Sequence, residues 1–263
     1  MKILHIWNPC SVASVIARAM DKKYNTDSSV VMSEKYDRYK DTVYGVTWDL
    51  HPILFKIKIL MYAKRFDIIH VHAREDLLPI LRKLYPKKKL IMHYHGSEIR
   101  DQWDVKHERW SLADHIFVST PDLLNGAPSD AELLHNPVDV SIFKPIPDVK
   151  KKGDAMTFEY DADEEAKELA ARFGLKLDIY KKNVLYANMP NLLNKYYYYV
   201  DIKRSKGKLL CEKGTISLVG LQSLACGIKV INRDGEIYDT LPNEHLPEYA
   251  MELVYRVYKE ILT

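Results

Sequence analysis

Two pairs of histidines are spaced so that the members of each pair lie on one side of a β-strand. His70 with His72, and His93 with His95, follow the pattern H-x-H, and residues i and i+2 of a strand share a face. Three carboxylates stand close by in the sequence, Glu75, Asp76 and Glu98. Histidine pairs with neighbouring carboxylates are typical of metal-dependent hydrolases, because imidazole is a common ligand of transition metals. However, His70 and His93 lie inside apolar runs, which favours core histidines with a backbone partner.

The run from His95 to Arg100, His-Gly-Ser-Glu-Ile-Arg, is the most informative segment of the first half. A strand that ends in His-Gly, with Ser97 as the helix N-cap, leaves the imidazole of His95 exposed beyond the strand. Gly96 allows a ligand to approach the backbone closely. An imidazole in this position can orient a sugar hydroxyl or hydrogen-bond it.

Strands and helices alternate in the stretches that must position these residues. Short apolar, β-branched runs predict strands at residues 2–7, 67–72, 90–95 and 115–119. Helical patterns begin near Ser11 and cover about 77–85. This βα alternation predicts an α/β protein with a doubly wound parallel sheet, in which ligands bind beyond the carboxyl ends of the strands.

A domain boundary is expected where prolines gather, at Pro137, Pro145 and Pro147, before the run from Lys150 to Gly153. The second half repeats the alternation. Strands are expected at 177–180, 197–202 and 229–232, and helices at 166–173, 216–225 and 246–262. We therefore predict two domains, residues 1–145 and residues 146–263.

Composition excludes several classes of protein. The chain has 263 residues, and its lysines and arginines exceed its acids by 39 − 36 = 3, too few for a protein that coats nucleic acid. Only ten glycines occur, the first at Gly45, and no spacing gives G-x-G-x-x-G or a P-loop. A classical dinucleotide-binding fold and a P-loop NTPase are therefore excluded. The three cysteines, Cys10, Cys211 and Cys226, are odd in number and far apart, which favours free thiols in a reducing cytosol.

No targeting or membrane-spanning segment is expected. Residues 1–7 are too short for a signal sequence, and no stretch of about 20 apolar residues occurs. The apolar helix expected at 52–65 carries Lys56, Lys58, Lys64 and Arg65. It is either an ordinary packed helix with its lysines in water or a basic patch that touches anionic lipid. We predict a cytoplasmic protein with a possible peripheral contact to the membrane through this helix.

Several motifs in order along the chain carry a resemblance to a known family. Four of them lie in the first 145 residues: Asp-Ile-Ile-His-Val-His at 67–72, His-Tyr-His-Gly-Ser-Glu-Ile-Arg at 93–100, Val-Ser-Thr-Pro-Asp at 118–122, and His-Asn-Pro-Val-Asp at 135–139 with Phe-Lys-Pro at 143–145. The fifth is the run from Gly214 to Asn232, which contains Ala-Cys-Gly at 225–227. This ordered set resembles the group 1 glycosyltransferases, the GT4-like branch of the GT-B fold.

The resemblance implies two Rossmann-like domains that face a cleft, with the second domain reduced. It implies transfer of a sugar from a nucleotide-sugar donor to a lipid or glycan acceptor that the sequence does not identify, with no metal or other cofactor required. The donor would bind mainly to the second domain and the acceptor to the first, and the terminal helix would cross back to the first. A retaining outcome follows only by analogy with the family.

The resemblance also assigns candidate residues. His95 would be the catalytic residue. The substrate-binding set would be His72, Gly96, Ser97, Glu98, Arg100 and Asn136. The nucleotide-sugar set would be Lys203, Arg204, Gly214, Thr215, Ile216, Ser217 and Gln222. In the second set, the free N–H groups at the start of the helix near Ile216 would suit a diphosphate.

Three departures from the family pattern support a different class of function. Residues 8–11, Asn-Pro-Cys-Ser, replace a glycine pair, the second domain lacks a G-R motif followed by lysine, and Gln222 replaces a ribose-binding glutamate. An amide in place of that carboxylate weakens donor binding by about 1 kcal/mol. The first alternative is therefore a catalytically silent GT-B-like binding protein, and the second is a metal-dependent hydrolase that uses the H-x-H pairs.

Overall fold

The computed structural model describes residues 1–160, 162–202, 204–205, 208–209 and 214–263. Contacts divide the chain into two compact units, Met1–Pro137 with Pro247–Thr263, and Val138–Leu246. The chain therefore passes from the first unit to the second after Pro137, eight residues before the boundary predicted after residue 145. The terminal helix belongs to the first unit.

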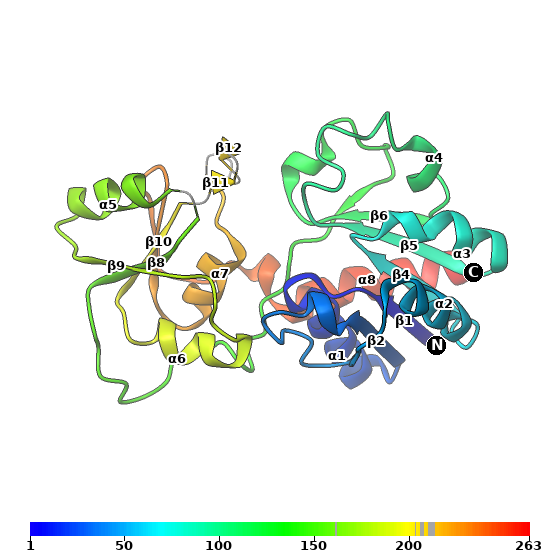
Figure 1. Cartoon of the computed structure of the whole chain (residues 1–263), viewed down its shortest axis with the longest axis horizontal. Helices are drawn as coiled ribbons and strands as arrows, with labels where there is room; N and C mark the ends of the chain where they lie inside the picture. The colour runs from blue at the N-terminus through cyan, green and yellow to red at the C-terminus, as the bar shows by residue number, and fades with distance from the viewer. Residues whose placement is uncertain (161, 203, 206–207, 210–213) are drawn as a thin grey trace. The chain divides into compact units, whose positions relative to one another are not determined.

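The first unit is built on a seven-stranded, fully parallel sheet in the order β3-β2-β1-β4-β5-β6-β7 (Figure 1). Its strands are β1 (Lys2–Ile6), β2 (Asp27–Ser33), β3 (Val46–Trp48), β4 (Ile68–His72), β5 (Lys89–Tyr94), β6 (His115–Val118) and β7 (Glu132–Leu133). The chain order reverses between β1 and β4, and an open α/β sheet binds ligands beyond the carboxyl ends of the strands at such a switch point. The α/β class with parallel sheets is confirmed.

Helices cover both faces of this sheet. They are α1 (Val12–Tyr24), α2 (Pro52–Ala63), α3 (Leu78–Leu84), the short α4 (His107–Trp110) and the terminal α8 (Pro247–Leu262). One face of the sheet, with Leu4, Ile69 and Met92, packs against α2 and α3. The other face, with Ile3 and Ile68, packs against α1 and α8. Tyr24 of α1 stacks on Tyr255 of α8 with ring centroids 3.7 Å apart.

The second unit has a five-stranded sheet in the order β14-β13-β10-β8-β9. Its strands are β8 (Ala155–Phe158), β9 (Leu177–Tyr180), β10 (Tyr198–Asp201), β13 (Lys229–Asn232) and β14 (Ile237–Tyr238), and only β14 is antiparallel to its neighbour. A separate antiparallel pair consists of β11 (Arg204–Ser205) and β12 (Lys208–Leu209). The helices are α5 (Asp163–Arg172), α6 (Met189–Leu193) and α7 (Leu218–Ala225).

The acidic segment that follows the predicted boundary has a local structural role. Asp163, Glu164 and Glu165 form the first turn of α5. Their negative charges stabilise the helix there, because they interact favourably with the free N–H groups and the positive end of the helix dipole. None of the helices in the described ranges is both long and apolar enough to cross a membrane.

Candidate functional site

Five histidines gather on one face of the first sheet, toward the carboxyl ends of its central strands. They are His5 on β1, His70 and His72 on β4, His93 on β5, and His95 just beyond it. The strand register pairs His5 with His70 and His72 with His93. On the same face, one step earlier along the strands, Ile3 pairs with Ile68. The layer under α1 and α8 thus changes from aliphatic to imidazole toward the edge where ligands bind.

Hydrogen bonds join four of these rings and a serine into one row. Nδ1 of His5 lies 3.1 Å from Nε2 of His72, and Nδ1 of His72 lies 3.2 Å from Nε2 of His95. The hydroxyl of Ser119, which follows β6, lies 2.9 Å from Nδ1 of His95 and 3.1 Å from Nε2 of His93. We refer to His5, His72, His95, Ser119 and His93 as the histidine row.

His70 lies outside the row, with Nδ1 2.6 Å from the hydroxyl of Tyr258 on α8. Its ring stacks on that of His72 at a centroid distance of 4.3 Å. His70 and His93 are buried, as expected for core histidines. Their hydrogen-bond partners, however, are the side chains of Tyr258 and Ser119, so the expected backbone partner is wrong.

Burial keeps these imidazoles neutral. It lowers the pKa of His5 to about 4 and the pKa of His95 to about 3, with small opposing effects from Asp21 and from a hydrogen bond to Asn136, respectively. The pKa values of His70, His72 and His93 also fall well below the ordinary value, first through burial and then through repulsion between the rings. A neutral imidazole donates one hydrogen bond and accepts one, so the row has a direction.

The structure brings part of the predicted substrate-binding set to His95. His72 and Asn136 contact its ring, and the carboxylate of Glu98 accepts a hydrogen bond from its backbone N–H. Both ring nitrogens of His95 already have partners in the row. A substrate hydroxyl must therefore displace Ser119 or His72 before His95 can exchange a proton with it.

The other members of that set are held differently. The guanidinium of Arg100 is paired with Asp122, with Nε 2.6 Å from Oδ2. Ser97 is exposed and its backbone carbonyl accepts from Gln102, while Gly96 is buried.

Of the three nearby carboxylates, Glu98 accepts the backbone N–H of His95 and the other two are paired with cations. Glu75 is buried and its Oε1 lies 2.7 Å from Nζ of Lys106 and 3.1 Å from Nη1 of Arg109. Asp76 is paired with Arg74. Among the described residues, the groups that can hold a metal near the pairs contain histidines only. A hydrolase that needs a carboxylate ligand on its metal therefore finds none in these groups of described residues.

Strained backbone marks the loops after β1 and β4. Trp7, Cys10, Ser11 and Ala73 all have left-handed φ angles, between 52° and 76°. Such conformations cost a non-glycine residue about 1–2 kcal/mol each, and they gather at functional sites. Cys10 and Ser11 thus adopt the backbone region that a glycine pair would reach freely.

In the second unit, the predicted diphosphate segment 214–217 lies before α7. The backbone N–H of Ser217 donates to Oδ2 of Asp201 at 2.6 Å, and the hydroxyl of Ser217 caps the helix by accepting from Gly220 N–H at 3.2 Å. The N–H of Gly214 donates to Oδ2 of Asp234 at 3.0 Å. Two carboxylates therefore already accept N–H groups that were predicted to hold a diphosphate.

The remaining residues of the predicted nucleotide-sugar set are placed as follows in the structure. Thr215 and Ile216 lie between these bonded groups and are half-buried, and Gln222 is buried in α7. Lys203 lies outside the described residues, and Arg204 is placed only as part of β11.

Sequence reasoning missed three residues of these sites, His5, Asp201 and Tyr258, whereas Ser119 lies at the end of the strand predicted at 115–119 and follows from the rule for strand ends. His5 lies on the same face of its strand as the apolar Ile3. A polar residue on an otherwise apolar strand face was the signal that could have identified it. Ser119 and Asp201 both follow or end a parallel strand, where ligand-binding groups are expected. Tyr258 comes from the far end of the chain, and no local pattern connects it with His70.

Comparisons with known proteins show a shared fold. No protein-family model matches the sequence, and no curated protein matches it. A sucrose-phosphate synthase of Thermosynechococcus elongatus is 11% identical, with a TM-score of 0.56 over 88% of this chain and 81% of that one. The spinosyn forosaminyltransferase SpnP is 9% identical, with a TM-score of 0.51 over 99% of this chain and 91% of that one. The chain therefore has the fold of GT-B glycosyltransferases.

Proposed function

We propose that the chain is a glycosyltransferase that moves a sugar from a nucleotide-sugar donor to an acceptor. The observation that carries the proposal is the position of the histidine row. It lies on the central strands, at the carboxyl edge of a sheet whose order reverses at β1 and β4, in a chain that shares its fold with two sugar-transferring enzymes. The ordered motifs of the GT4-like branch support the same function.

In this proposal the first unit binds the acceptor. His95 hydrogen-bonds the attacking hydroxyl once that hydroxyl takes the place of Ser119 at Nδ1. Because burial holds the pKa of His95 near 3, the ring is neutral at physiological pH and accepts a hydrogen bond there. Asn136 and Glu98 support the ring and its backbone.

The second unit binds the donor around the start of α7, with Gln222 toward the ribose. Asp201 and Asp234 already accept these N–H groups, and Asp234 also forms an ion pair with Arg233 at 3.6 Å, so a diphosphate must replace a carboxylate as acceptor of the Ser217 or Gly214 N–H. Sugar and ribose hydroxyls, in contrast, can donate to these carboxylates directly. No metal or other cofactor takes part in this proposal, and the retaining outcome remains an analogy that the configuration of the product would test.

Calorimetry against UDP-, GDP- and ADP-sugars tests the proposal. We expect one class of donor to bind below millimolar concentration, and the Asp234→Asn variant to bind it more tightly because one repelling charge is removed. An exposed acid away from the site, in Glu108→Gln, is the matched control. If no donor binds below millimolar, the chain is not a transferase of this kind.

The two carboxylates also favour the first alternative, a GT-B-like protein that binds without catalysis. That alternative predicts donor binding, or none, with no turnover in the parent chain. Measurable turnover in the Gln222→Glu variant alone would support it, and turnover in the parent chain would exclude it.

The predicted membrane contact belongs to the same proposal, because it would bring the first unit to a lipid-linked acceptor. Helix α2 buries Phe55, Ile59 and Leu60 in the core, yet its opposite side is apolar too. Met61 is 72% exposed and Ile53 is 64% exposed, with Leu54 and Ile57 also exposed. Core packing therefore explains only one side of this helix.

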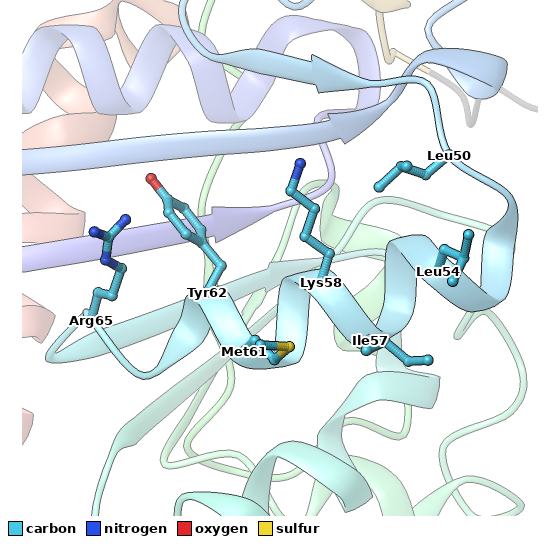
Figure 2. Close-up of a pocket in the computed structure, with 7 residues that line it drawn as sticks. All are labelled: Leu50, Leu54, Ile57, Lys58, Met61, Tyr62 and Arg65. Atoms are coloured by element: carbon cyan, nitrogen blue, oxygen red, sulfur yellow. The ribbon is translucent and has the colours of Figure 1, made fainter.

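Basic residues accompany the exposed apolar side chains. Residues 52–65 contain four cations and no acid. A groove along the helix is lined by Leu50, Leu54, Ile57, Lys58, Met61, Tyr62 and Arg65 (Figure 2). Lys58 lies over the Trp48 ring, 4.2 Å from its centroid. Lys56 forms an ion pair with Asp76. Apolar anchors beside the other basic residues fit the surface of an anionic bilayer.

Sedimentation with vesicles tests this contact. We expect the chain to bind vesicles that contain phosphatidylglycerol more tightly than pure phosphatidylcholine, and Met61→Asp to weaken that binding at least tenfold. Val105→Asp is the control, since Val105 is 84% exposed and does not line the groove. Equal binding by both variants would show that α2 is not the contact.

A further inference from the structure

Three histidines of the first unit have the arrangement of ligands around one metal ion. His72, His93 and His95 each offer a ring nitrogen, and these nitrogens lie within 4.8 Å of one another. Nδ1 of His72 and Nε2 of His95 are 3.2 Å apart. Two nitrogens bound to a tetrahedral zinc ion at its usual bond length lie about 3.3 Å apart. The observed pair is therefore close to coordination distance without movement of the backbone.

The rest of the histidine row supplies the outer contacts that metal-binding histidines need. With Nδ1 of His72 and Nε2 of His95 on the metal, Nε2 of His72 donates to His5 and Nδ1 of His95 donates to Ser119. With Nδ1 of His93 on the metal, Nε2 of His93 also donates to the Ser119 hydroxyl, whose oxygen can accept both hydrogen bonds. Such partners fix the tautomer and the orientation of ligating imidazoles.

The third ring has a nitrogen left over. Nδ1 of His93 is buried and has no hydrogen-bond partner among the described residues. Leaving a buried polar atom unpaired is unfavourable, whereas coordination to a metal would satisfy it. The row alone, with hydrogen bonds and no metal, does not use this atom.

A second triad, His5, His70 and His72, also lies within 4.8 Å, but all three rings are fully buried. The triad of His72, His93 and His95 is less enclosed, since His95 is half-buried and stands at the carboxyl edge of the sheet. The ion and a fourth, exogenous ligand would enter from that edge.

We propose that His72, His93 and His95 bind a zinc-class transition-metal dication with one open coordination position. Imidazole ligands suit Zn²⁺, Co²⁺, Ni²⁺ and Cu²⁺, whereas Mg²⁺ and Ca²⁺ require oxygen ligands that this cluster lacks. The site shares His95 with the proposed sugar transfer, so a bound ion would leave Nδ1 of His95 as a donor and take away the acceptor that the transfer uses. It also differs from the hydrolase alternative, because no carboxylate joins the ligands.

Metal binding can be measured on the full chain, purified without a histidine tag and stripped with chelator. We expect equilibrium dialysis to give one equivalent of Zn²⁺, Co²⁺ to give the absorption of a tetrahedral complex, and Mg²⁺ to compete with neither. Zinc X-ray absorption on the wild-type chain should show three imidazole ligands. Less than one tenth of an equivalent of Zn²⁺, or a zinc shell dominated by oxygen, would overturn the proposal.

Variants localise the site. His95→Gln should weaken Zn²⁺ binding at least tenfold, and Ser119→Ala should weaken it about tenfold through loss of an outer contact. His107→Gln, a change at an exposed histidine outside the cluster, should leave it unchanged. Unaltered binding in a folded His95→Gln variant would overturn the assignment. Donor calorimetry on the metal-free wild type keeps this result separate from the proposed transfer.

Discussion

Acidification should unfold the first unit well before it protonates most carboxylates. His5 is fully buried, and burial lowers its pKa from 6.5 to about 4. The folded state therefore binds fewer protons than the unfolded state between these two values, so the free energy of unfolding falls as the pH falls through that interval. The contribution is fully present above pH 6.5 and is lost by about pH 4.

The magnitude follows from the size of the shift. The difference between 6.5 and about 4 corresponds to about 3 kcal/mol, because one pH unit is worth a little more than 1 kcal/mol. His70, His72 and His93 shift in the same direction. Since domains are commonly stable by only about 5–15 kcal/mol, the combined loss is large enough to unfold this unit between pH 6.5 and pH 4.

Tryptophan fluorescence makes the measurement specific. All four tryptophans, Trp7, Trp48, Trp103 and Trp110, lie in the first unit. Urea unfolding of the chelator-treated chain at several pH values between 7.5 and 4.5 should give a free energy that falls steeply with acidification. His5→Leu should reduce that slope by up to about 1.4 kcal/mol per pH unit. His107→Gln should not change it.

A flat profile between pH 7 and pH 5 would refute the reasoning, because it would mean that the buried imidazoles carry protons in the folded state. An unchanged slope in a folded His5→Leu variant would show that His5 is not among the groups responsible.

Three further predictions concern other parts of the chain. Gly220→Ala should destabilise the second unit by about 1–3 kcal/mol, since the added Cβ would lie 2.5 Å from a methyl of Ile216 and 2.6 Å from Oδ2 of Asp201; faster hydrogen exchange in β10 and α7 would show it, and unchanged exchange would contradict it. Glu75→Gln should cost the first unit about 1–3 kcal/mol in urea unfolding, because Lys106 and Arg109 lose their shared, buried carboxylate; Glu108→Gln, on an exposed acid of the same helix as Arg109, should cost almost nothing. Gln222→Glu should tighten donor binding about fivefold in calorimetry, as a gain of about 1 kcal/mol requires, and weaker binding would mean that this side chain does not meet the ribose.

Much of the fold could be predicted from local pattern. The strands at 177–180 and 229–232 have the predicted bounds, since each is a short apolar run with clear turn signals at its ends. Strands β2, β3, β7, β8 and β14 of the two larger sheets were not predicted. β3, β7 and β14 are two or three residues long, too short for a period of two to be visible, and their pairing with longer strands is what makes them strands.

The candidate site could be predicted only where it follows from strand ends. That rule selects His72 and His95, and the structure places them 3.2 Å apart. It could not show that His5, from a strand more than 60 residues earlier, pairs with His72, because the position of β1 beside β4 is a property of sheet order. The bond between His70 and Tyr258 spans 188 residues and depends on where the terminal helix packs.

The candidate sites of the two units differ in charge, and this difference bears on the proposed nucleotide-sugar donor. In the first unit, the groups at the carboxyl edge are neutral imidazoles whose buried nitrogens hydrogen-bond one another. In the second, Asp201 is 3% exposed and holds the Ser217 N–H, and Asp234 holds the Gly214 N–H. A helix start favours an anion through those same N–H groups, so a bound diphosphate would stand beside two carboxylates that it has displaced. Arg233 offsets part of that repulsion through its ion pair with Asp234. The buried Asp201 is therefore the carboxylate that most opposes a diphosphate at the start of α7.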